Sequence, residues 1–320
     1  MVSVTFPGLG LEFSLNPVAF TIPIFGGLSI RWYALIIVTG MITAFAYASF
    51  RSKDNGLTPG NMLDVGLWTI IVGIVGARLY YVFANISSYH SFRDVIAVWE
   101  GGLAIYGGII AGGITLFVMC RIYKLDWRCV FDTAAPGVMI AQAIGRWGNF
   151  VNGEAFGVGP AESSPLYFLR MTVNGNGPYA PTFLYESVWN LTGFILINIF
   201  YKKRKFKAEV FLWYATWYGF GRFFIESLRT DSLYAGTLRI SQVVGAVSFV
   251  VGLTLIIVFR ILAAKKSKYE AVPEGADNVS ASVPTPEETV TDTDSPVNES
   301  EKAGSAGEET GEGKSDGDTD

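Results

Sequence analysis

Several arginines and carboxylates interrupt apolar stretches of this sequence, and together they could bind an anionic group. Arg222, Glu226 and Arg229 follow one another at intervals of four and three residues, so a helix places all three on one face. Charged side chains within apolar helices normally face the bundle interior or a wet cavity, and guanidinium groups bind phosphate through paired hydrogen bonds. We therefore expect a phosphate site that includes Arg78, Arg146, Glu186, Arg222 and Arg229.

A second group of polar residues lies at the end of an apolar stretch, in residues 145–157. The segment reads Gly-Arg-Trp-Gly-Asn-Phe-Val-Asn-Gly-Glu-Ala-Phe-Gly and contains Arg146, Asn149, Asn152 and Glu154. Its glycines permit positive φ angles and close approach of the backbone to a ligand, while the arginine and the amides supply hydrogen-bond donors. This segment predicts a site for an anionic lipid headgroup.

Some of these residues also have purely structural interpretations. Arg222 and Glu226 could form a structural ion pair, and Arg78 could extend to the outer lipid headgroups. Asp64 and Asp132 could complement the N-terminal charge of helices. Close helix packing is the first explanation for a group of recurring glycines, namely Gly101, Gly102, Gly107, Gly108, Gly112 and Gly113.

Seven apolar stretches must position these residues. The chain has 320 residues, of which 50% are hydrophobic and only 16% are charged, against about 25% charged in a typical soluble domain. About 20 apolar residues suffice to cross the hydrocarbon core of a bilayer. We expect an all-α integral membrane protein with seven transmembrane helices, at residues 32–50, 61–84, 102–121, 130–150, 182–200, 209–228 and 240–261.

The basic residues indicate how these helices are oriented. They cluster in alternate loops, and the positive-inside rule assigns those loops to the cytoplasm. The N-terminus is then outside, the C-terminus is cytoplasmic, and the long outer loops near 85–100 and 151–181 form an extracytoplasmic cap. The basic clusters are Arg51 and Lys53; Arg121, Lys124 and Arg128; Lys202, Lys203, Arg204, Lys205 and Lys207; and Arg260, Lys265, Lys266 and Lys268.

Charge divides the chain into a basic body and an acidic tail. Residues 270–320 hold 15 acidic residues and two lysines, so a body near +9 and a tail near −13 make up the net charge of −4. The tail has too few apolar residues to offset chain entropy. We expect an outer-face segment at 1–29, a membrane domain with the site at 30–263, and a disordered acidic cytoplasmic tail at 264–320.

Histidine and cysteine are scarce, which excludes several kinds of site. His90 is the one histidine, and it is expected on the surface of an outer loop, so a histidine metal centre or a Ser-His-Asp triad is not expected. The two cysteines, Cys120 and Cys129, cannot form a disulfide framework or a four-ligand zinc site. No cofactor and no nucleic-acid partner are predicted.

The segment 145–157 closely resembles the signature of the prolipoprotein diacylglyceryl transferases, G-R-x-G-N-F-x-N-x-E-x-x-G, with every fixed position filled. The resemblance extends over roughly residues 15–262 and omits the acidic tail. Further matches follow the order of that family: Arg31-Trp32-Tyr33, Gly76-Ala77-Arg78-Leu79, Glu100-Gly101-Gly102, Pro181-Thr182, Tyr185-Glu186, Gly221-Arg222, Glu226 and Arg229.

The resemblance implies a seven-span transferase of the bacterial plasma or inner membrane. Such an enzyme moves the diacylglyceryl group of phosphatidylglycerol to the lipobox cysteine of a preprolipoprotein signal peptide, forms a thioether and releases glycerol phosphate. The leaving phosphate needs positive charge where its own charge develops, and the thiol must lose its proton to attack. The expected partners are phosphatidylglycerol, the lipobox peptide and membrane lipids.

The same resemblance implies roles for individual residues. Arg146 and Arg222 are expected in catalysis, the first at the headgroup phosphate and the second at the leaving group or the thiol. Glu226 and Glu154 would orient these arginines, Tyr33 would line the cavity, and Gly157 would shape a turn. The residues expected to bind substrate are Tyr33, Arg78, Arg146, Asn149, Glu154, Gly157 and Arg229.

Two positions depart from the family pattern. Many members carry a histidine, proposed as the base for the thiol, where this chain has Tyr106, and another usual histidine is Ala180 here. Tyrosine has an unperturbed pKa near 10 and is a poor base at neutral pH, although it can donate a hydrogen bond. Tyr106 is kept as a catalytic candidate, and we expect arginine charge to lower the pKa of the thiol enough to replace a histidine base.

Two other functions would suit parts of the sequence. A transporter of anionic solutes or lipids would also use buried arginines, but it would alternate its access and form no thioether. A membrane scaffold for lipoproteins would bind the signal peptide without consuming phosphatidylglycerol, and it would tolerate replacement of arginine by lysine.

Overall fold

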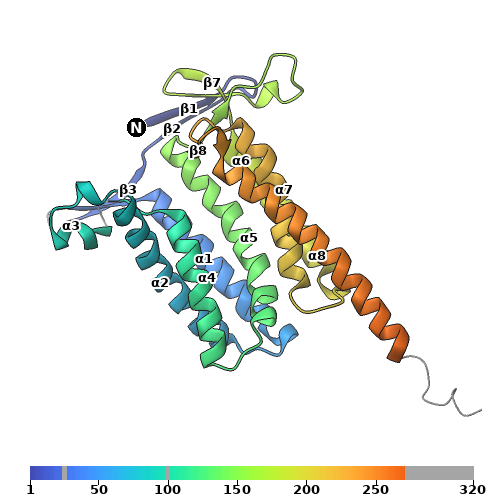
Figure 1. Ribbon diagram of the computed structural model, residues 1–320. Coiled ribbons are helices and arrows are strands. Elements are labelled where there is room, and N and C mark those ends of the chain that lie inside the picture. The colour runs from blue at the N-terminus through green and yellow to red at the C-terminus, as the bar shows by residue number, and fades with distance from the viewer. Residues whose placement is uncertain (24–26, 99–100, 271–320) are drawn as a thin grey trace, which may run out of the picture. The chain divides into compact units, whose positions relative to one another are not determined.

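The computed structural model describes residues 1–23, 27–98 and 101–270, and this part of the chain is mostly helical (Figure 1). Each of the seven predicted segments falls on one long helix. These helices are α1 (Trp32–Arg51), α2 (Pro59–Ala84), α4 (Ile105–Ile122), α5 (Trp127–Asn152), α6 (Thr182–Phe200), α7 (Glu209–Leu228) and α8 (Ile240–Glu270). Helix α8 continues seven residues into the predicted tail, and residues 271–320 lie outside the described residues.

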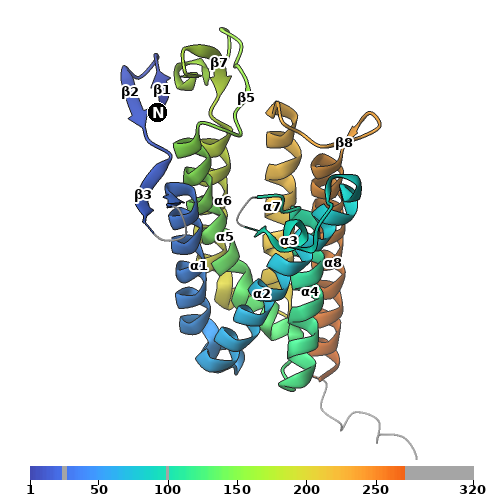
Figure 2. The same cartoon turned by 90° about the vertical axis from the view of Figure 1, so that its left-hand side faces the viewer.

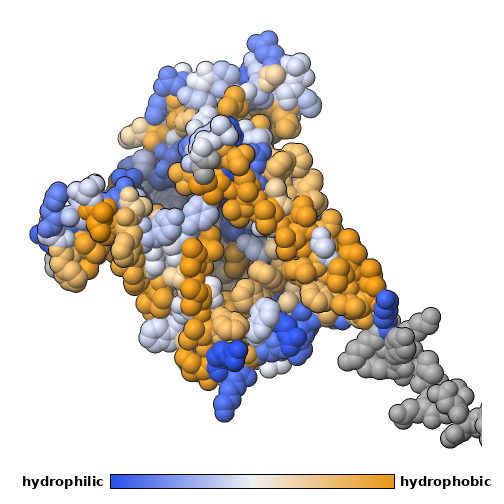
Figure 3. Space-filling view, viewed as in Figure 1, coloured by the Kyte–Doolittle hydropathy of each residue, from blue (hydrophilic) through white to orange (hydrophobic). Residues whose placement is uncertain are grey.

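Five of the long helices are apolar enough over sufficient length to cross a membrane, namely α1, α2, α4, α6 and α8. Helices α5 and α7 are less apolar because they carry many of the charged residues discussed above, including Arg146 and Arg222. Figure 3 shows apolar side chains over the helices and hydrophilic side chains gathered near their two ends. The protein therefore has the surface of a multi-pass membrane protein.

Small residues allow several of these helices to pack closely in pairs. Helix α2 lies along α4, α1 along α5, and α7 along α8. A Cβ atom on Gly76 would lie 2.8 Å from the carbonyl oxygen of Gly107, and one on Gly219 would lie 2.6 Å from that of Gly245. The predicted packing role is thus confirmed for Gly107, whereas no described atom lies within 4 Å of a Cβ built on Gly113.

A small antiparallel sheet lies at one end of the helices, as Figure 2 shows. Its strand order is β2-β1-β6-β7-β5, so the N-terminal residues pair with the loop between α5 and α6. Val4, Phe6, Met171, Val173 and Phe183 form its apolar core, which joins the sheet to the start of α6. The strands are β1 (Val2–Phe6), β2 (Leu11–Leu15), β5 (Gly157–Val158), β6 (Met171–Val173) and β7 (Asn176–Ala180).

The mostly helical structure is consistent with the expected all-α membrane protein, and the 151–181 loop adds the short strands β5, β6 and β7 to it. Trp99 and Glu100 of the predicted outer loop lie outside the described residues. The remaining described elements are short. These elements are β3 (Val18–Ile22), β4 (Leu28–Arg31), β8 (Tyr234–Ala235), β9 (Leu238–Arg239), α3 (Phe92–Ile96), η1 (Ser52–Asn55), η2 (Ile86–Ser88), η4 (Tyr167–Leu169) and η5 (Tyr201–Lys203).

Asp132 complements a helix N-terminus, as expected, but the helix is a neighbouring one. Its carboxylate accepts hydrogen bonds from the backbone N–H groups of Ala208 and Phe211, at 2.8 and 2.9 Å. These groups belong to the start of α7, where the backbone donors have no partner within the helix. Asp132 therefore fixes α7 against α5, while Asp64 is exposed on α2.

Candidate functional site

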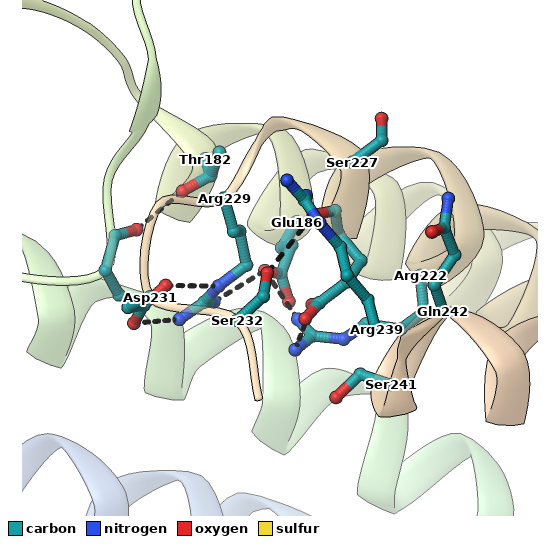
Figure 4. Close-up of polar contacts among 12 residues, drawn as sticks. Thr182, Glu186, Arg222, Ser227, Arg229, Asp231, Ser232, Arg239, Ser241 and Gln242 are labelled. Carbon is teal, nitrogen blue, oxygen red and sulfur yellow. Dashed lines mark hydrogen bonds and ion pairs between the residues drawn. The ribbon is translucent and has the colours of Figure 1, made fainter. Parts of the chain in front are cut away.

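Three arginines contact one buried carboxylate, that of Glu186 in α6. Arg146 lies on α5, Arg222 lies on α7, and Arg229 directly follows the last residue of α7. Glu186 is only 3% exposed. Its Oε1 lies 3.0 Å from Nη1 of Arg222 and 3.2 Å from Nη1 of Arg229, and its Oε2 lies 2.6 Å from Nη2 of Arg146. Glu186 therefore joins α5, α6 and the C-terminal end of α7, and Figure 4 shows Arg222 and Arg229 directed toward it.

A second carboxylate supports Arg222 from within its own helix. Nη2 of Arg222 lies 2.6 Å from Oε2 of Glu226, which is 1% exposed. The predicted contact at a spacing of four residues is thus confirmed. Because Nη1 donates a hydrogen bond to Glu186 and Nη2 forms an ion pair with Glu226, the guanidinium group of Arg222 is held at two points.

The loop after α7 adds two further charged residues. Asp231 forms an ion pair with Arg229 at 2.7 Å. Burial raises the pKa of Asp231, but the hydrogen bond and the charge of Arg229 lower it by more. The pKa of Asp231 therefore lies below its usual range. Arg239, at the end of β9, donates to the backbone carbonyl of Glu226 and, through Nε, to the hydroxyl of Tyr234 at 3.0 Å. Arg146, Arg222, Arg229 and Arg239 are called the arginine cluster below.

Arg146 also contacts the polar residues that end α5. Its Nη1 lies 3.4 Å from Oδ1 of Asn149, and the amides of Asn149 and Asn152 each donate to Oε1 of Glu154 at 3.2 Å. Glu154 is linked to Arg146 through Asn149, and its role in orienting that arginine stays a prediction. Arginine has five N–H donors, so Arg146 has more donors than its contacts within the described chain occupy.

A cavity of about 480 Å³ begins beside Arg146 and Asn149 and extends between α1, α2, α4 and α5. Tyr33 lines it at the same end, where its ring packs so closely on α5 that a Cβ on Gly148 would lie 2.7 Å from its Cδ2. The rest of the wall is almost wholly apolar, with residues such as Ile37, Met41 and Val138. The site thus joins a group of cationic donors to a long apolar compartment.

Comparison with known proteins supports the resemblance seen in the sequence. A family model described as prolipoprotein diacylglyceryl transferase matches residues 17–258. The chain belongs to the prolipoprotein diacylglyceryl transferase family. Proteins named phosphatidylglycerol–prolipoprotein diacylglyceryl transferase are 42% identical in Limosilactobacillus reuteri, 42% in Clostridium perfringens and 43% in Streptococcus pyogenes, over 76 to 79% of this chain and 94 to 98% of theirs.

The region matched by the prolipoprotein diacylglyceryl transferase family contains the whole arginine cluster and all three of its carboxylates. Arg239 was absent from the expected site, whereas Glu186 was expected in the phosphate site but was given no individual catalytic or substrate-binding role. A carboxylate near the start of an apolar stretch was the available signal for Glu186. Arg239 immediately precedes the last apolar stretch, where a basic residue is common at a membrane interface, so its position alone gave no functional signal.

Arg78 has a structural environment of its own in this family member. It is buried, and its guanidinium donates to the backbone carbonyls of Asp94, Val95, Gly101 and Gly102 at 2.5 to 3.0 Å. The alternative in which Arg78 extends to lipid headgroups is therefore wrong. Arg78 holds α3 and the segment that follows it against α2, and its role in substrate binding stays a prediction.

Tyr106 lies near the start of α4 and contacts α8. Its hydroxyl is 3.3 Å from Oγ of Ser241, and Figure 4 shows Ser241 near Arg239 and Gln242. Ser241 follows Arg239 by two residues, so Tyr106 is linked to the part of the chain that carries the cluster.

Among the described residues, no group of three or more His, Cys, Asp or Glu side chains is arranged to hold a metal ion.

Gly157 permits a close approach of two chain segments, and it does not form the turn predicted for it. The turn after α5 is made by Gly153 and Ala155, whose φ angles are 61° and 57°. Gly157 lies in β5 and forms an isolated antiparallel bridge with Arg229. A Cβ at this position would lie 2.7 Å from the carbonyl oxygen of Leu228 and 2.8 Å from Cγ2 of Thr182.

Replacing Gly157 with alanine is expected to destabilise the protein and reduce its transfer activity. The added methyl group must displace the backbone that carries Arg229, and such overpacking costs about 1–3 kcal/mol. Thermal unfolding in detergent and the initial rate of transfer measure the two effects. Gly113→Ala is the matched control, because no described atom lies within 4 Å of its added Cβ. Equal unfolding temperatures for Gly157→Ala and the unchanged protein would contradict this account.

Proposed function

We propose that this protein transfers the diacylglyceryl group of phosphatidylglycerol to the lipobox cysteine of a preprolipoprotein, with formation of a thioether and release of glycerol phosphate. The observation that carries the proposal is the apolar cavity that ends at Arg146 and Asn149. A lipid with an anionic headgroup matches both parts of this arrangement. The names of the bacterial relatives, which include phosphatidylglycerol and prolipoprotein, support the same reaction.

The arginine cluster supplies what the leaving group requires. The thiolate sulfur attacks the glycerol carbon next to the phosphate, a C–S bond forms, and the C–O bond breaks with its electron pair on the phosphate oxygen. Negative charge therefore grows on the phosphate, and preorganised guanidinium donors stabilise it. Arg146 binds the phosphate with Asn149, and Arg222 assists the leaving group. Glu186 and Glu226 hold both guanidinium groups in place.

The same positive charge favours the nucleophile. A thiol beside guanidinium groups has a lowered pKa and forms the thiolate more readily. The thiol proton leaves as the thiolate forms, and the terminal oxygen of the released glycerol phosphate can finally accept it. This chain has no histidine at the position where many relatives carry one. The hydroxyl of Tyr106 contributes a hydrogen bond rather than a base in this proposal.

All seven long helices are proposed to span the plasma membrane of a bacterium. Helices α5 and α7 carry their charges toward the protein interior, where Glu186 neutralises part of them. The basic loops lie on the cytoplasmic side by the positive-inside rule. The sheet of β1, β2, β5, β6 and β7 then lies outside, at the end of the helices where Arg146 and Arg222 meet the lipobox peptide.

A transfer assay with two peptides tests the reaction. Purified protein in detergent is incubated with phosphatidylglycerol and a synthetic lipobox peptide, and the products are identified by mass spectrometry. We expect the cysteine peptide to gain a diacylglyceryl mass with release of glycerol phosphate, and the serine peptide to remain unchanged. Absence of a mass gain on the cysteine peptide, with Arg146-dependent lipid binding retained, would instead favour a lipid transporter or a scaffold.

Replacing Tyr106 with phenylalanine is expected to leave transfer within about tenfold of the unchanged rate. The arginine cluster does the electrostatic work, and a net hydrogen bond contributes only about 0.5–1.5 kcal/mol. The pH dependence of the transfer rate is the measurement. A loss of several hundredfold in correctly folded Tyr106→Phe would contradict this expectation and assign an essential role to the hydroxyl.

A further inference from the structure

The cavity beside Arg146 is long, and its inner end is closed. Its wall follows one face of α1 from Tyr33 through Ile37, Met41 and Ala44 to Ala48. Tyr33 and Ala48 are fifteen residues apart, which corresponds to about 22 Å along a helix. That length exceeds half of the bilayer core, which is about 15 Å. An acyl chain can therefore lie along the cavity in an extended form.

A packed apolar cluster forms the inner end. Ala48, Met62, Val65 and Val130 line the cavity there, and all four are buried members of one hydrophobic cluster. We call these four residues the cavity floor. They come from α1, α2 and α5, so three helices fix the position of the floor.

Buried polar contacts border the floor and oppose its simple extension. The amide of Asn55 in η1 donates to the hydroxyl oxygens of Thr133 and Tyr201, at 2.6 and 2.8 Å. Asn55 lies in η1, which follows α1 directly on the side of Ala48 away from Tyr33. Thr133 lies on α5 three residues nearer to Arg146 than Val130, so these polar groups border the floor. An acyl chain that entered among these groups would have to break buried hydrogen bonds, which is costly.

We propose that the distance between Arg146 and the cavity floor sets the longest acyl chain that the protein accepts. This proposal rests on the proposed function, because it assumes that the headgroup phosphate is held at Arg146. The bilayer is as apolar as the cavity, so burial of extra methylenes gives little net gain. Selection therefore acts through steric exclusion at the floor, and it sets an upper limit rather than an optimum.

Substitutions at the floor test the proposal. The unchanged protein and its variants receive an equimolar mixture of phosphatidylglycerols that differ only in acyl-chain length, and mass spectrometry of the modified peptide gives the proportion of each chain. Ala48→Leu is expected to shorten the longest accepted chain by about two methylenes, with about tenfold discrimination against longer chains. Met62→Ala is expected to extend the limit. Ala46→Leu is the matched control, since Ala46 is exposed on α1 and does not line the cavity.

The two possible failures can be told apart. If Ala48→Leu and Met62→Ala both transfer with the product proportions of the unchanged protein, the floor does not limit chain length and the proposal is overturned. If no protein transfers any chain, the proposed function fails. The same lipid mixture is then measured as bound lipid by native mass spectrometry, where an unaltered distribution in both variants overturns the proposal and a shifted one supports it.

Discussion

Replacing Glu186 with glutamine is expected to reduce diacylglyceryl transfer by about a hundredfold or more. The carboxylate contacts Arg146, Arg222 and Arg229 in a buried position. Glutamine has nearly the same shape but no charge, so three guanidinium groups lose their shared anion and repel one another. Breaking a buried ion pair from one side costs about 3–5 kcal/mol, and the arginines no longer hold the geometry that the phosphate requires.

The measurement combines the initial transfer rate with thermal unfolding in detergent, so that loss of fold and loss of chemistry are separated. Glu186→Asp keeps the charge and should retain more activity than Glu186→Gln. Glu162→Gln is the control, because Glu162 is exposed in the outer loop. A folded Glu186→Gln protein with the unchanged rate would show that this carboxylate does not organise the site.

Replacing Arg222 or Arg146 with lysine is expected to reduce turnover by about 10²–10³-fold, the cost of losing one preorganised donor to a developing oxyanion. Arg222 donates a hydrogen bond to Glu186 through Nη1 and forms an ion pair with Glu226 through Nη2. The single ammonium group of lysine cannot reproduce this planar, two-point contact. Lysine keeps the positive charge, so the expected loss reports geometry rather than charge.

Release of glycerol phosphate with saturating lipid and peptide gives the turnover number for these variants. Lipid binding is expected to weaken much less than turnover falls, because the charge remains. Arg93→Lys is the control, since Arg93 is exposed on α3. Turnover equal to that of the unchanged protein in both Arg146→Lys and Arg222→Lys would refute the phosphate site and favour a binding or scaffold function.

Features with a strong local signal could be predicted from the sequence. The seven apolar stretches predicted the seven long helices within a few residues at most ends, because length and hydropathy determine such helices locally. The spacing of Arg222 and Glu226 predicted their contact for the same reason, since helical geometry alone brings them together. The small side chain of Gly107 similarly indicated close helix packing.

Features that depend on the packing of distant segments could not be predicted. The sequence placed Glu186 and three arginines in one expected site, but their direct contacts depend on the packing of three helices, which no spacing in the sequence encodes. The sheet pairs Thr5 with Thr172, which are 167 residues apart in the sequence. The alternation in Val2–Phe6 was a usable signal for a strand, but its partner strands are too short to be recognised alone.

The arginine cluster and the cavity floor lie mostly on different helices, which affects how the sequence can change during evolution. The arginine cluster and its carboxylates lie on α5, α6, α7 and the loop after α7, whereas the cavity floor lies on α1, α2 and α5. Substitutions at distant sites without shared partners usually combine additively. A lineage whose membrane lipids change can thus adjust the floor residues while the reacting groups stay untouched, and adaptation to a new membrane need not pass through an inactive ancestor.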